Sequence, residues 1–338
     1  MRPALGISVS LCRFLDDMAP APFATPILLI GYRRAPTTRK VIESLRPIQP
    51  KILFFAVNGP NPAVSGEEEQ CQAVRDLTSE IDWECRIHRL FRNEHLAAPE
   101  SISGAITWFF NNVEEGIILE DDCVCDSSFF FFAEELLEKY RDNPKIMQIG
   151  ATNFVPQVFS GPASYCFSTY AYIWGWATWR RAWSTFDLGL NSLTHDSLES
   201  ILKSRFSRPE DISYWRALYQ YLKSGNLSTW DGQWNLTVFR QQGLSIVPRE
   251  NLVHNIGFGA QSTNTTALTA SIAQMQVGKL QWPLIHPEHF VADSVSDDAV
   301  SDNVFGIQRS YWTFHLKMRI ASRLSPRVKG KLKQVLGW

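Results

Sequence analysis

Short apolar runs alternate with amphipathic stretches from residue 26 to residue 150, and this alternation constrains the fold more than any other feature of the sequence. The apolar runs, which we predict to be strands, are 26–32, 51–60, 116–120 and 145–150, and a further strand is predicted at 85–91, where apolar residues alternate with charges. The stretches predicted to be helices are about 36–45, 67–80, 100–111 and 127–140, the last capped by Ser127. Strands and helices that alternate at this spacing are typical of an α/β sandwich with a mostly parallel central sheet flanked by helices.

After residue 150 the pattern changes but remains mixed. We predict strands at 164–172 and 244–248, and helices near 196–205, 209–224 and 228–243. The last helix has Ser228 or Thr229 near its start. Residues 1–24 are predicted to be a tail, because charges follow their short apolar stretch too closely for a signal peptide. Residues 266–308 are rich in polar residues typical of loops.

Composition bears on the partners and on the compartment. The formal net charge is -1, so no overall field favours binding to nucleic acid. The six cysteines are scattered without a Cys-x-x-Cys pair, which favours a reducing cytoplasm over a disulfide framework. No apolar run approaches the roughly 20 residues that a membrane span requires. We therefore expect a cytoplasmic protein that does not bind nucleic acid.

The last thirty residues, 309–338, hold eight Lys or Arg side chains, no Asp or Glu, and several interleaved aromatic residues. A basic amphipathic segment of this kind can lie on an anionic membrane surface, which would place the protein peripherally at the inner face of the membrane. The alternative, which we favour because the apolar period is imperfect, is a solvated terminal helix with one packed side.

Three carboxylates, Glu120, Asp121 and Asp122, stand side by side at the end of the strand predicted at 116–120. Ligands of open α/β sheets bind outside the carboxyl ends of the strands, where Asn58 is also expected. Adjacent carboxylates repel one another unless a cation or several donors compensate them. Mg²⁺ and Mn²⁺ combine one or two carboxylates with phosphate oxygens and water, so the cluster predicts a metal-bound nucleotide diphosphate. The alternative is a solvated acidic loop.

Two other chemistries fit the cluster less well. An aspartyl phosphatase would need two aspartates two positions apart directly after the strand, and neither Glu120 nor Asp121 begins such a pair. Cys123 and Cys125 have no second pair of Cys or His nearby. They therefore predict buried structural thiols in preference to a zinc site.

Three blocks in order, 116–154, 170–183 and 229–259, resemble a bacterial group of GT-A fold glycosyltransferases, also described as family-2-like or nucleotide-diphospho-sugar transferases. The group is distantly similar to N-acetylglucosaminyltransferase I. The likeness covers about residues 25–265. It implies a metal-dependent, inverting transfer of a sugar from a nucleotide-diphosphate sugar to a glycan or lipid-linked acceptor, as in polysaccharide biosynthesis, with a UDP-sugar as the favoured donor.

The resemblance also assigns regions and roles. It implies a nucleotide-binding half at 25–150 and an acceptor half at 151–265. Asp122, the last acid of the Glu-Asp-Asp motif, would hold Mn²⁺ or Mg²⁺. Asp121 would then face the ribose, and Glu120 the donor sugar. A divalent ion at this place would stabilise the charge that develops on the leaving diphosphate.

Inversion requires a base that deprotonates the acceptor hydroxyl, and Asp231 in the block TWDGQW is our candidate. The competing interpretation is an acid at a helix start that interacts favourably with the helix dipole. Trp230, together with Trp174 and Trp176 of the block IWGWATW, can stack on sugar faces, and Gly175 can let the backbone approach a ligand. Core packing is the alternative for the tryptophans.

Several positions depart from the pattern of the group that the sequence resembles. Asn58 stands where that group has an acid that reads the base or ribose, and Arg33 or Arg34 could pair with a phosphate. Ala97 and Asn264 replace a Gly and a His. These departures leave open a catalytically weakened homologue that binds nucleotide or glycan as a scaffold. A nucleotidyltransferase is a third alternative, although GYRRAPTTR is a poor version of its Gly-rich loop.

Overall fold

The structure is a computed structural model that describes residues 23–257 and 275–307. Nearly all of the predicted N-terminal tail, the basic segment 309–338 and Asn264 lie outside the described residues. Among the helices within the described ranges, none combines the length and the apolar character needed to cross a membrane.

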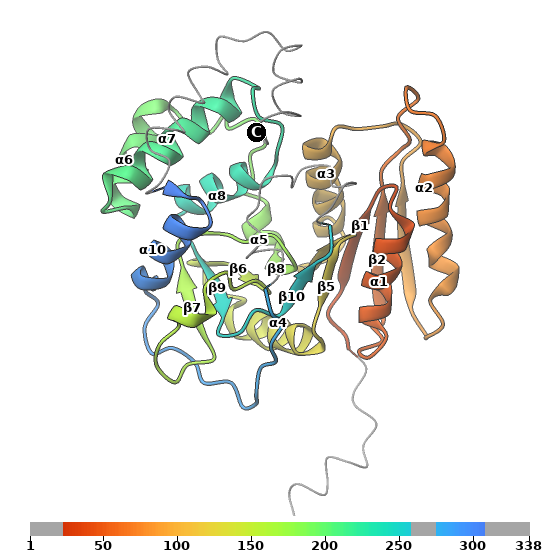
Figure 1. The fold of residues 1–338 in the computed structure, drawn as a ribbon, viewed down its shortest axis with the longest axis horizontal. Helices are drawn as coiled ribbons and strands as arrows, with labels where there is room; N and C mark the ends of the chain where they lie inside the picture. The colour runs from red at the N-terminus through yellow and green to blue at the C-terminus, as the bar shows by residue number, and fades with distance from the viewer. Residues whose placement is uncertain (1–22, 258–274, 308–338) are drawn as a thin grey trace, which may run out of the picture.

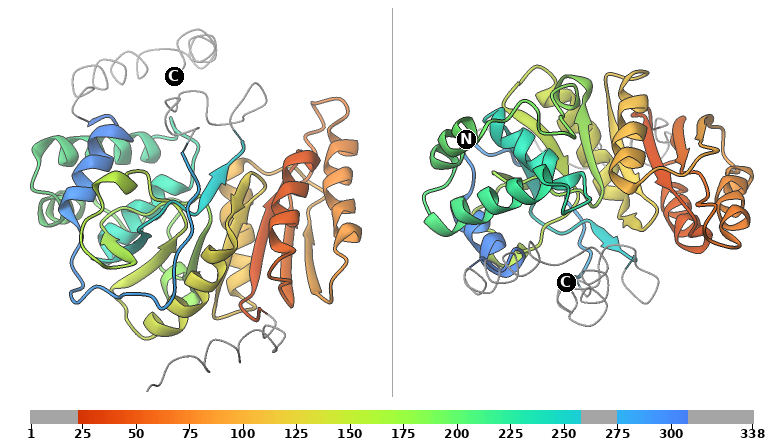
Figure 2. Two further views of the ribbon diagram at one scale, coloured as in Figure 1. Left: turned by 60° about the horizontal axis from the view of Figure 1, so that its bottom comes forward. Right: turned by 90° about the horizontal axis from the view of Figure 1, so that it is seen from above.

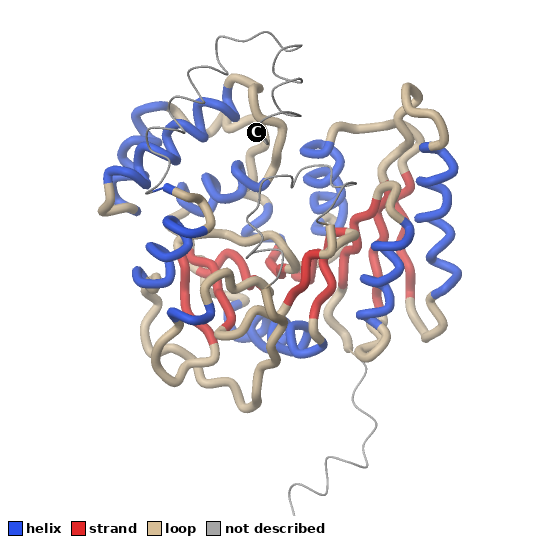
Figure 3. The backbone as a smooth tube through the Cα atoms, in the orientation of Figure 1, coloured by secondary structure: helices blue, strands red, loops and turns tan. Residues whose placement is uncertain are grey.

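An eight-stranded sheet runs through the middle of the described chain (Figure 1, Figure 3). Its strands, in spatial order, are β3 (Arg86–Phe91), β2 (Ile52–Val57), β1 (Ile27–Gly31), β4 (Glu115–Glu120), β8 (Trp176–Trp179), β6 (Ile146–Gly150), β9 (Leu244–Pro248) and β7 (Tyr165–Ser168). All of them share one direction except β8 and β7, which are antiparallel to their neighbours. The predicted α/β fold with a mostly parallel sheet is therefore confirmed.

Helices cover both faces of this sheet (Figure 2). They are α1 (Ala35–Leu45), α2 (Glu67–Asp76), α3 (Ala98–Phe110), α4 (Ser127–Tyr140), α5 (Arg180–Trp183) and α8 (Asp231–Arg240). In β1, Ile27 and Leu29 pack with α1, α2 and α4, whereas Leu28 and Ile30 pack with α3, α5 and α8. Successive strand residues point to opposite faces, and both faces are buried, so the central strands are continuous apolar runs.

The remaining helices lie in the second half of the chain, except for η1, which follows α2 directly. They are α6 (His195–Arg205), α7 (Pro209–Lys223), α10 (Ser294–Asn303) and two 3₁₀ turns, η1 (Leu77–Glu80) and η2 (Pro156–Val158). Leu202 of α6, Trp215 of α7 and Val300 of α10 pack together with Leu236 of α8 in a separate core cluster. This cluster supports α8, which begins at Asp231.

The starts of two helices differ from the prediction. Helix α4 begins at Ser127, but its cap is Asp126, whose carboxylate accepts the backbone N–H of Ser128 at 2.9 Å. A carboxylate is favoured over a hydroxyl here because it also complements the positive end of the helix dipole. Helix α8 begins at Asp231, later than predicted, and its N-cap residue Trp230 makes no side-chain cap hydrogen bond.

The sequence does not predict three short strands, β5 (Cys123–Cys125), β10 (Val253–Asn255) and β8. Strands β5 and β10 form a separate antiparallel pair directly after the acid cluster. Strand β8 lies between β4 and β6, so the two predicted halves of the domain share one sheet. These segments are too short to show a clear period in the sequence.

Residues 275–307 are not all loop as predicted, because they contain α10, which is capped by Asp293. The buried carboxylate of Asp297 in α10 accepts the hydroxyl of Ser168 at 2.5 Å and the backbone N–H of Thr169 at 2.9 Å. Both partners lie at the end of β7. Asp297 therefore fastens this segment to the edge of the sheet.

Asp297 is expected to make stability depend on pH. Burial raises its pKa from 3.8 to about 6, although the hydrogen bonds from Ser168 and Thr169 oppose this shift. The folded protein therefore binds this proton more tightly than the unfolded chain, so the contribution to stability is full below about pH 4 and lost as the pH rises through about 6. Relative to Asp297→Asn, the free energy of unfolding of the wild type should fall by about 2–3 kcal/mol from pH 4 to pH 7.

Urea unfolding at stepped pH measures this difference. The matched control is Asp298→Asn, which changes an exposed carboxylate of the same helix and should follow the wild type. If the free energies of unfolding of the wild type and Asp297→Asn changed by the same amount between pH 4 and pH 7, the raised pKa of Asp297 would be contradicted.

Candidate functional site

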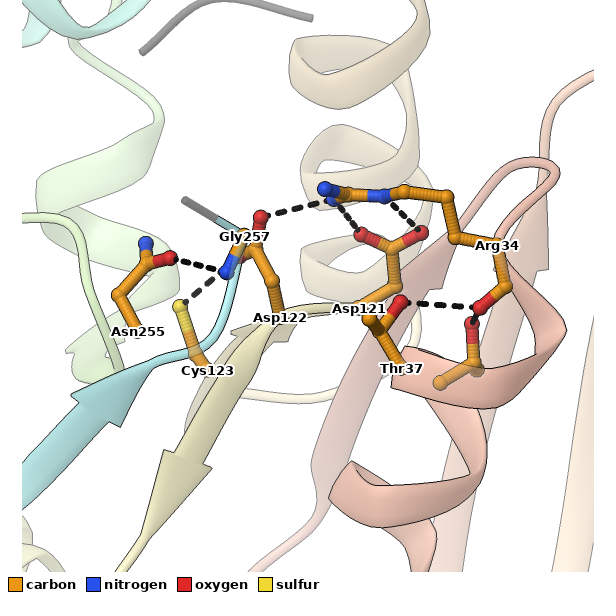
Figure 4. A network of polar contacts seen from close by, with 8 residues as sticks. Arg34, Thr37, Asp121, Asp122, Cys123, Asn255 and Gly257 are labelled. Atoms are coloured by element: carbon orange, nitrogen blue, oxygen red, sulfur yellow. Dashed lines mark hydrogen bonds and ion pairs between the residues drawn. The ribbon is translucent and has the colours of Figure 1, made fainter. Parts of the chain in front are cut away.

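The carboxyl ends of β1 and β4 bring Arg34 beside Asp121 and Asp122 (Figure 4). The two strands are parallel neighbours, and Ile30 lies opposite Glu120. Because the chain leaves both strands at the same edge of the sheet, a side chain just after β1 meets side chains just after β4. The site is therefore a direct consequence of this strand pairing.

The guanidinium of Arg34 compensates the two aspartates. Its Nη2 contacts Asp121 Oδ1 and donates to Asp122 Oδ2 at 2.7 Å, while its Nε donates to Asp121 Oδ2 at 3.4 Å. The exposed fraction of the side chain is 20% for Arg34, 6% for Asp121 and 16% for Asp122. Burial raises the pKa of Asp121 to about 6, and the charge of Arg34 opposes this shift. Removing one partner from a pair this sheltered would leave the other charge uncompensated.

Asp122 is held against the end of β10. Its backbone carbonyl accepts the N–H of Ile256 at 2.8 Å, and Cys123 Sγ lies 3.5 Å from its Oδ1. A Cβ at Gly257 would lie 2.2 Å from its Oδ2, so glycine is required at that position. The N–H of Gly257 donates to Asn255 Oδ1 at 2.8 Å, which fixes the backbone there. The carboxylate of Asp122 therefore has a defined position.

The second half of the chain brings Asp231 to the same region. Asp231 is half-buried at the start of α8, and its carboxylate accepts the hydroxyl of Thr229. Burial raises the pKa of Glu120, and the neighbouring acids of the cluster raise it further. The charge of Asp231 is among the causes of this shift, so Asp231 lies within electrostatic reach of Glu120.

The acid cluster offers carboxylate oxygens, which are the ligands that a hard cation such as Mg²⁺ prefers. No group of three His, Cys, Asp or Glu side chains within the described residues is arranged to hold a metal ion. A cation at Asp122 would complete its coordination with phosphate oxygens and water, which is how Mg²⁺ binds in phosphate-containing sites. Burial raises the pKa of the Cys123 thiol, so this side chain is protonated in the absence of a metal. The carboxylate oxygens therefore fit Mn²⁺ or Mg²⁺.

The sequence predicts that Asn58 hydrogen-bonds the edge of the nucleotide base. In the structure its side chain makes hydrogen bonds to a neighbouring loop. Its amide donates to the Leu96 carbonyl at 2.8 Å, and its oxygen accepts the N–H groups of Gly59 and Leu96 at 3.0 and 3.2 Å. A Cβ at Gly59 would lie 2.2 Å from the Glu94 carbonyl, so the turn requires glycine. Asn58 therefore fastens the turn after β2 to the loop that leads into α3.

Arg33 belongs to a separate polar cluster. Its Nη1 donates to Glu67 Oε1 at 2.6 Å, and Glu67 is almost fully buried at the start of α2. The Tyr32 hydroxyl lies 3.0 Å from Nδ1 of His95. Arg33 is thus paired with Glu67, whereas the next residue, Arg34, pairs with the acid cluster.

Two members of the predicted aromatic platform lie in the core. Trp176 has no exposed surface, and its ring stacks on that of Trp230, which is 3% exposed, with the centroids 5.9 Å apart. Neither residue offers a ring face to a ligand in this structure, because β8 lies inside the sheet and its face is covered by α8. Trp174 is half-buried beside Phe154 and retains exposed surface. Of the three tryptophans of the predicted platform, it is the one that is not buried in the core.

Gly175 is explained by packing and backbone conformation. Its φ is 63°, in the left-handed region, and a Cβ would lie 2.7 Å from Cys125 Sγ. We expect Gly175→Ala to lower the free energy of unfolding by about 2–4 kcal/mol, because backbone strain and overpacking add. Gly225→Ala is the control, since its φ is 68° and a Cβ there meets no atom within 4 Å.

Gly225→Ala should lower the free energy of unfolding by about 1–2 kcal/mol, because it adds backbone strain without overpacking. Urea unfolding of both variants measures the difference. Equal losses would mean that contact with Cys125 does not restrict position 175.

Comparisons with known proteins identify no family. No family model matches the chain, and no curated protein matches it. Solved structures that resemble it include apo UDP-glucose pyrophosphorylase (9% identity, 69% of this chain and 93% of that chain, TM-score 0.34). Another is HddC from Yersinia pseudotuberculosis (10% identity, 51% and 81%, TM-score 0.29). A third is 4-diphosphocytidyl-2C-methyl-D-erythritol synthase from Anaerococcus prevotii (9% identity, 60% and 82%, TM-score 0.29). TM-scores this low carry no argument about activity.

Sequence reasoning misses two features of the site. Arg34 is expected there only as a partner for phosphate. Its place directly after the first strand is visible in the sequence, but its pairing with the acids also requires that β1 and β4 be neighbours, which the structure shows. The requirement for glycine at position 257 is missed as well. It arises because the carboxylate of Asp122, which is distant in the sequence, packs against the backbone of Gly257, and such a contact leaves no local pattern in a single sequence.

Proposed function

We propose that this protein is a metal-dependent, inverting glycosyltransferase of the GT-A type. It would move a sugar from a nucleotide-diphosphate sugar to a glycan or lipid-linked acceptor. The observation that carries the proposal is the acid cluster at the carboxyl end of β4, where Asp122 is held by Ile256 beside Arg34, while Asp231 at the start of α8 supplies a separate carboxylate. An inverting transfer needs these two elements together, a metal ligand for the diphosphate and a separate carboxylate as base.

In the proposed mechanism Asp231 accepts the proton of the acceptor hydroxyl, oriented by the hydrogen bond from Thr229. The acceptor oxygen bonds to the anomeric carbon from the face opposite the diphosphate. The bond from that carbon to the diphosphate oxygen breaks, and the nucleoside diphosphate leaves with the electron pair. Asp122 would hold Mn²⁺ or Mg²⁺, which supplies positive charge to the leaving diphosphate when bound.

The remaining parts of the proposal concern the ligands and the setting. Asp121 would face the ribose, Glu120 the donor sugar, and Trp174 would stack on a sugar ring. A UDP-sugar is the favoured donor. We place the reaction in polysaccharide biosynthesis in the cytoplasm, and residues 309–338 would provide any peripheral contact with the membrane.

A panel of UDP-, GDP- and CMP-sugars tests the proposal, with each assayed for thermal shift in Mn²⁺ and in chelator. We expect a shift that needs both metal and nucleotide diphosphate, followed by release of the nucleoside diphosphate when an acceptor is added. A nucleotidyltransferase would instead form a nucleoside triphosphate and a sugar 1-phosphate from the nucleotide sugar and pyrophosphate. Binding without any turnover would favour the weakened homologue.

A further inference from the structure

Arg34 occupies the surroundings that a metal ion at Asp122 would have to share. Its Nη2 lies 2.7 Å from Asp122 Oδ2 and also contacts Asp121. The backbone at Gly257 closes another side of Oδ2, where even a Cβ would lie 2.2 Å away. Oδ2 of Asp122 thus has a backbone on one side and a guanidinium on another (Figure 4).

A divalent ion that binds Oδ2 of Asp122 would have to displace this guanidinium from the same oxygen, because two cations on one carboxylate oxygen repel each other. Within the described chain the acidic partners of Arg34 are Asp121 and Asp122. The nearby buried acid Glu67 is already paired with Arg33. A metal ion on its own therefore removes one of the two acidic partners of Arg34 and leaves Asp121 as the other, without giving the guanidinium a new partner.

A nucleotide diphosphate changes this balance, because a guanidinium binds phosphate oxygens in the same forked geometry as carboxylate oxygens. We infer that Arg34 competes with a divalent cation for Asp122 and thereby couples metal binding to diphosphate binding. The metal takes Asp122, and the released guanidinium pairs with the diphosphate. This inference rests on the proposed function for its two ligands and adds that neither is bound independently of the other.

Binding of Mn²⁺ to the full chain, followed by the EPR signal of the free ion, tests the inference without any measurement of activity. For the wild type, we expect saturating UDP to tighten Mn²⁺ binding by about tenfold or more. For Arg34→Gln, we expect Mn²⁺ alone to bind about tenfold more tightly than to the wild type, and the further gain from UDP to be largely lost.

Two further variants control for charge and for folding. Arg39→Gln removes an exposed arginine that pairs with Glu80, so it makes the same change in net charge and should behave as the wild type. Arg34→Lys keeps the charge but loses the forked geometry, and its Mn²⁺ affinity should fall between those of the wild type and Arg34→Gln. If Arg34→Gln fails to fold because Asp121 is left uncompensated, Arg34→Lys carries the comparison.

The outcomes separate the inference from the proposed function. Equal Mn²⁺ affinities for the wild type and Arg34→Gln would overturn the inference, and metal-dependent binding of a UDP-sugar would still support the function. The inference would also be overturned if UDP bound equally well with and without Mn²⁺ and did not bind to Arg34→Gln. Arg34 would then bind the diphosphate in place of the metal. If no nucleotide sugar binds, the proposed function fails, while Mn²⁺ alone still decides whether Arg34 competes for Asp122.

Discussion

Asp231→Asn is expected to lower the rate of sugar transfer by about 10²- to 10⁴-fold and to leave the affinity for UDP unchanged. The amide cannot accept the proton of the acceptor hydroxyl. It can still accept the hydroxyl of Thr229, so the start of α8 should be preserved. Measurement of kcat with a saturating acceptor, together with the Kd for UDP in Mn²⁺, separates catalysis from binding.

The matched control for this variant is Asp196→Asn. Asp196 is an exposed acid in the first turn of α6, so it tests whether an acid at a helix start acts only on the helix dipole. We expect Asp196→Asn to transfer sugar at the wild-type rate. If Asp231→Asn also kept its rate and lost only a few tenths of a kcal/mol in stability, the dipole interpretation would replace the catalytic one.

The second large effect is expected for Asp122→Ala, which should abolish the thermal shift that needs both Mn²⁺ and UDP. Loss of residues that merely orient metal ligands commonly weakens binding by about 10–100-fold, so loss of the ligand itself should exceed this. The fold should survive, because Asp121 still compensates Arg34. Isothermal titration of Mn²⁺ in the presence of UDP gives the affinity directly.

Asp142→Ala is the control, since Asp142 is exposed and lies just after the end of α4, whereas the acid cluster precedes the start of that helix. It should retain the wild-type shift. If Asp122→Ala bound UDP as tightly as the wild type in the presence of chelator, the assignment of Asp122 as the metal ligand would be wrong.

The sequence predicts the central strands correctly because they are buried on both faces and therefore apolar without interruption. It misses β8 because the run IWGWATW is rich in tryptophan, and tryptophan is equally consistent with a core strand and with a sugar platform. Burial of Trp176 and Trp230 against each other resolves this choice. The sequence also predicts the wrong N-cap residue for α4, because Asp126 and Ser127 are both residue types that favour this position.

The sequence alone determined the alternation of strands and helices and the place of three carboxylates at the end of a strand. Both follow from local patterns, which are readable in a single chain. Only the tertiary structure decided that Arg34 compensates Asp121 and Asp122, and that Asp231 lies within electrostatic reach of Glu120. These contacts depend on which strands are neighbours in the sheet, and strand order has no local periodicity in the sequence.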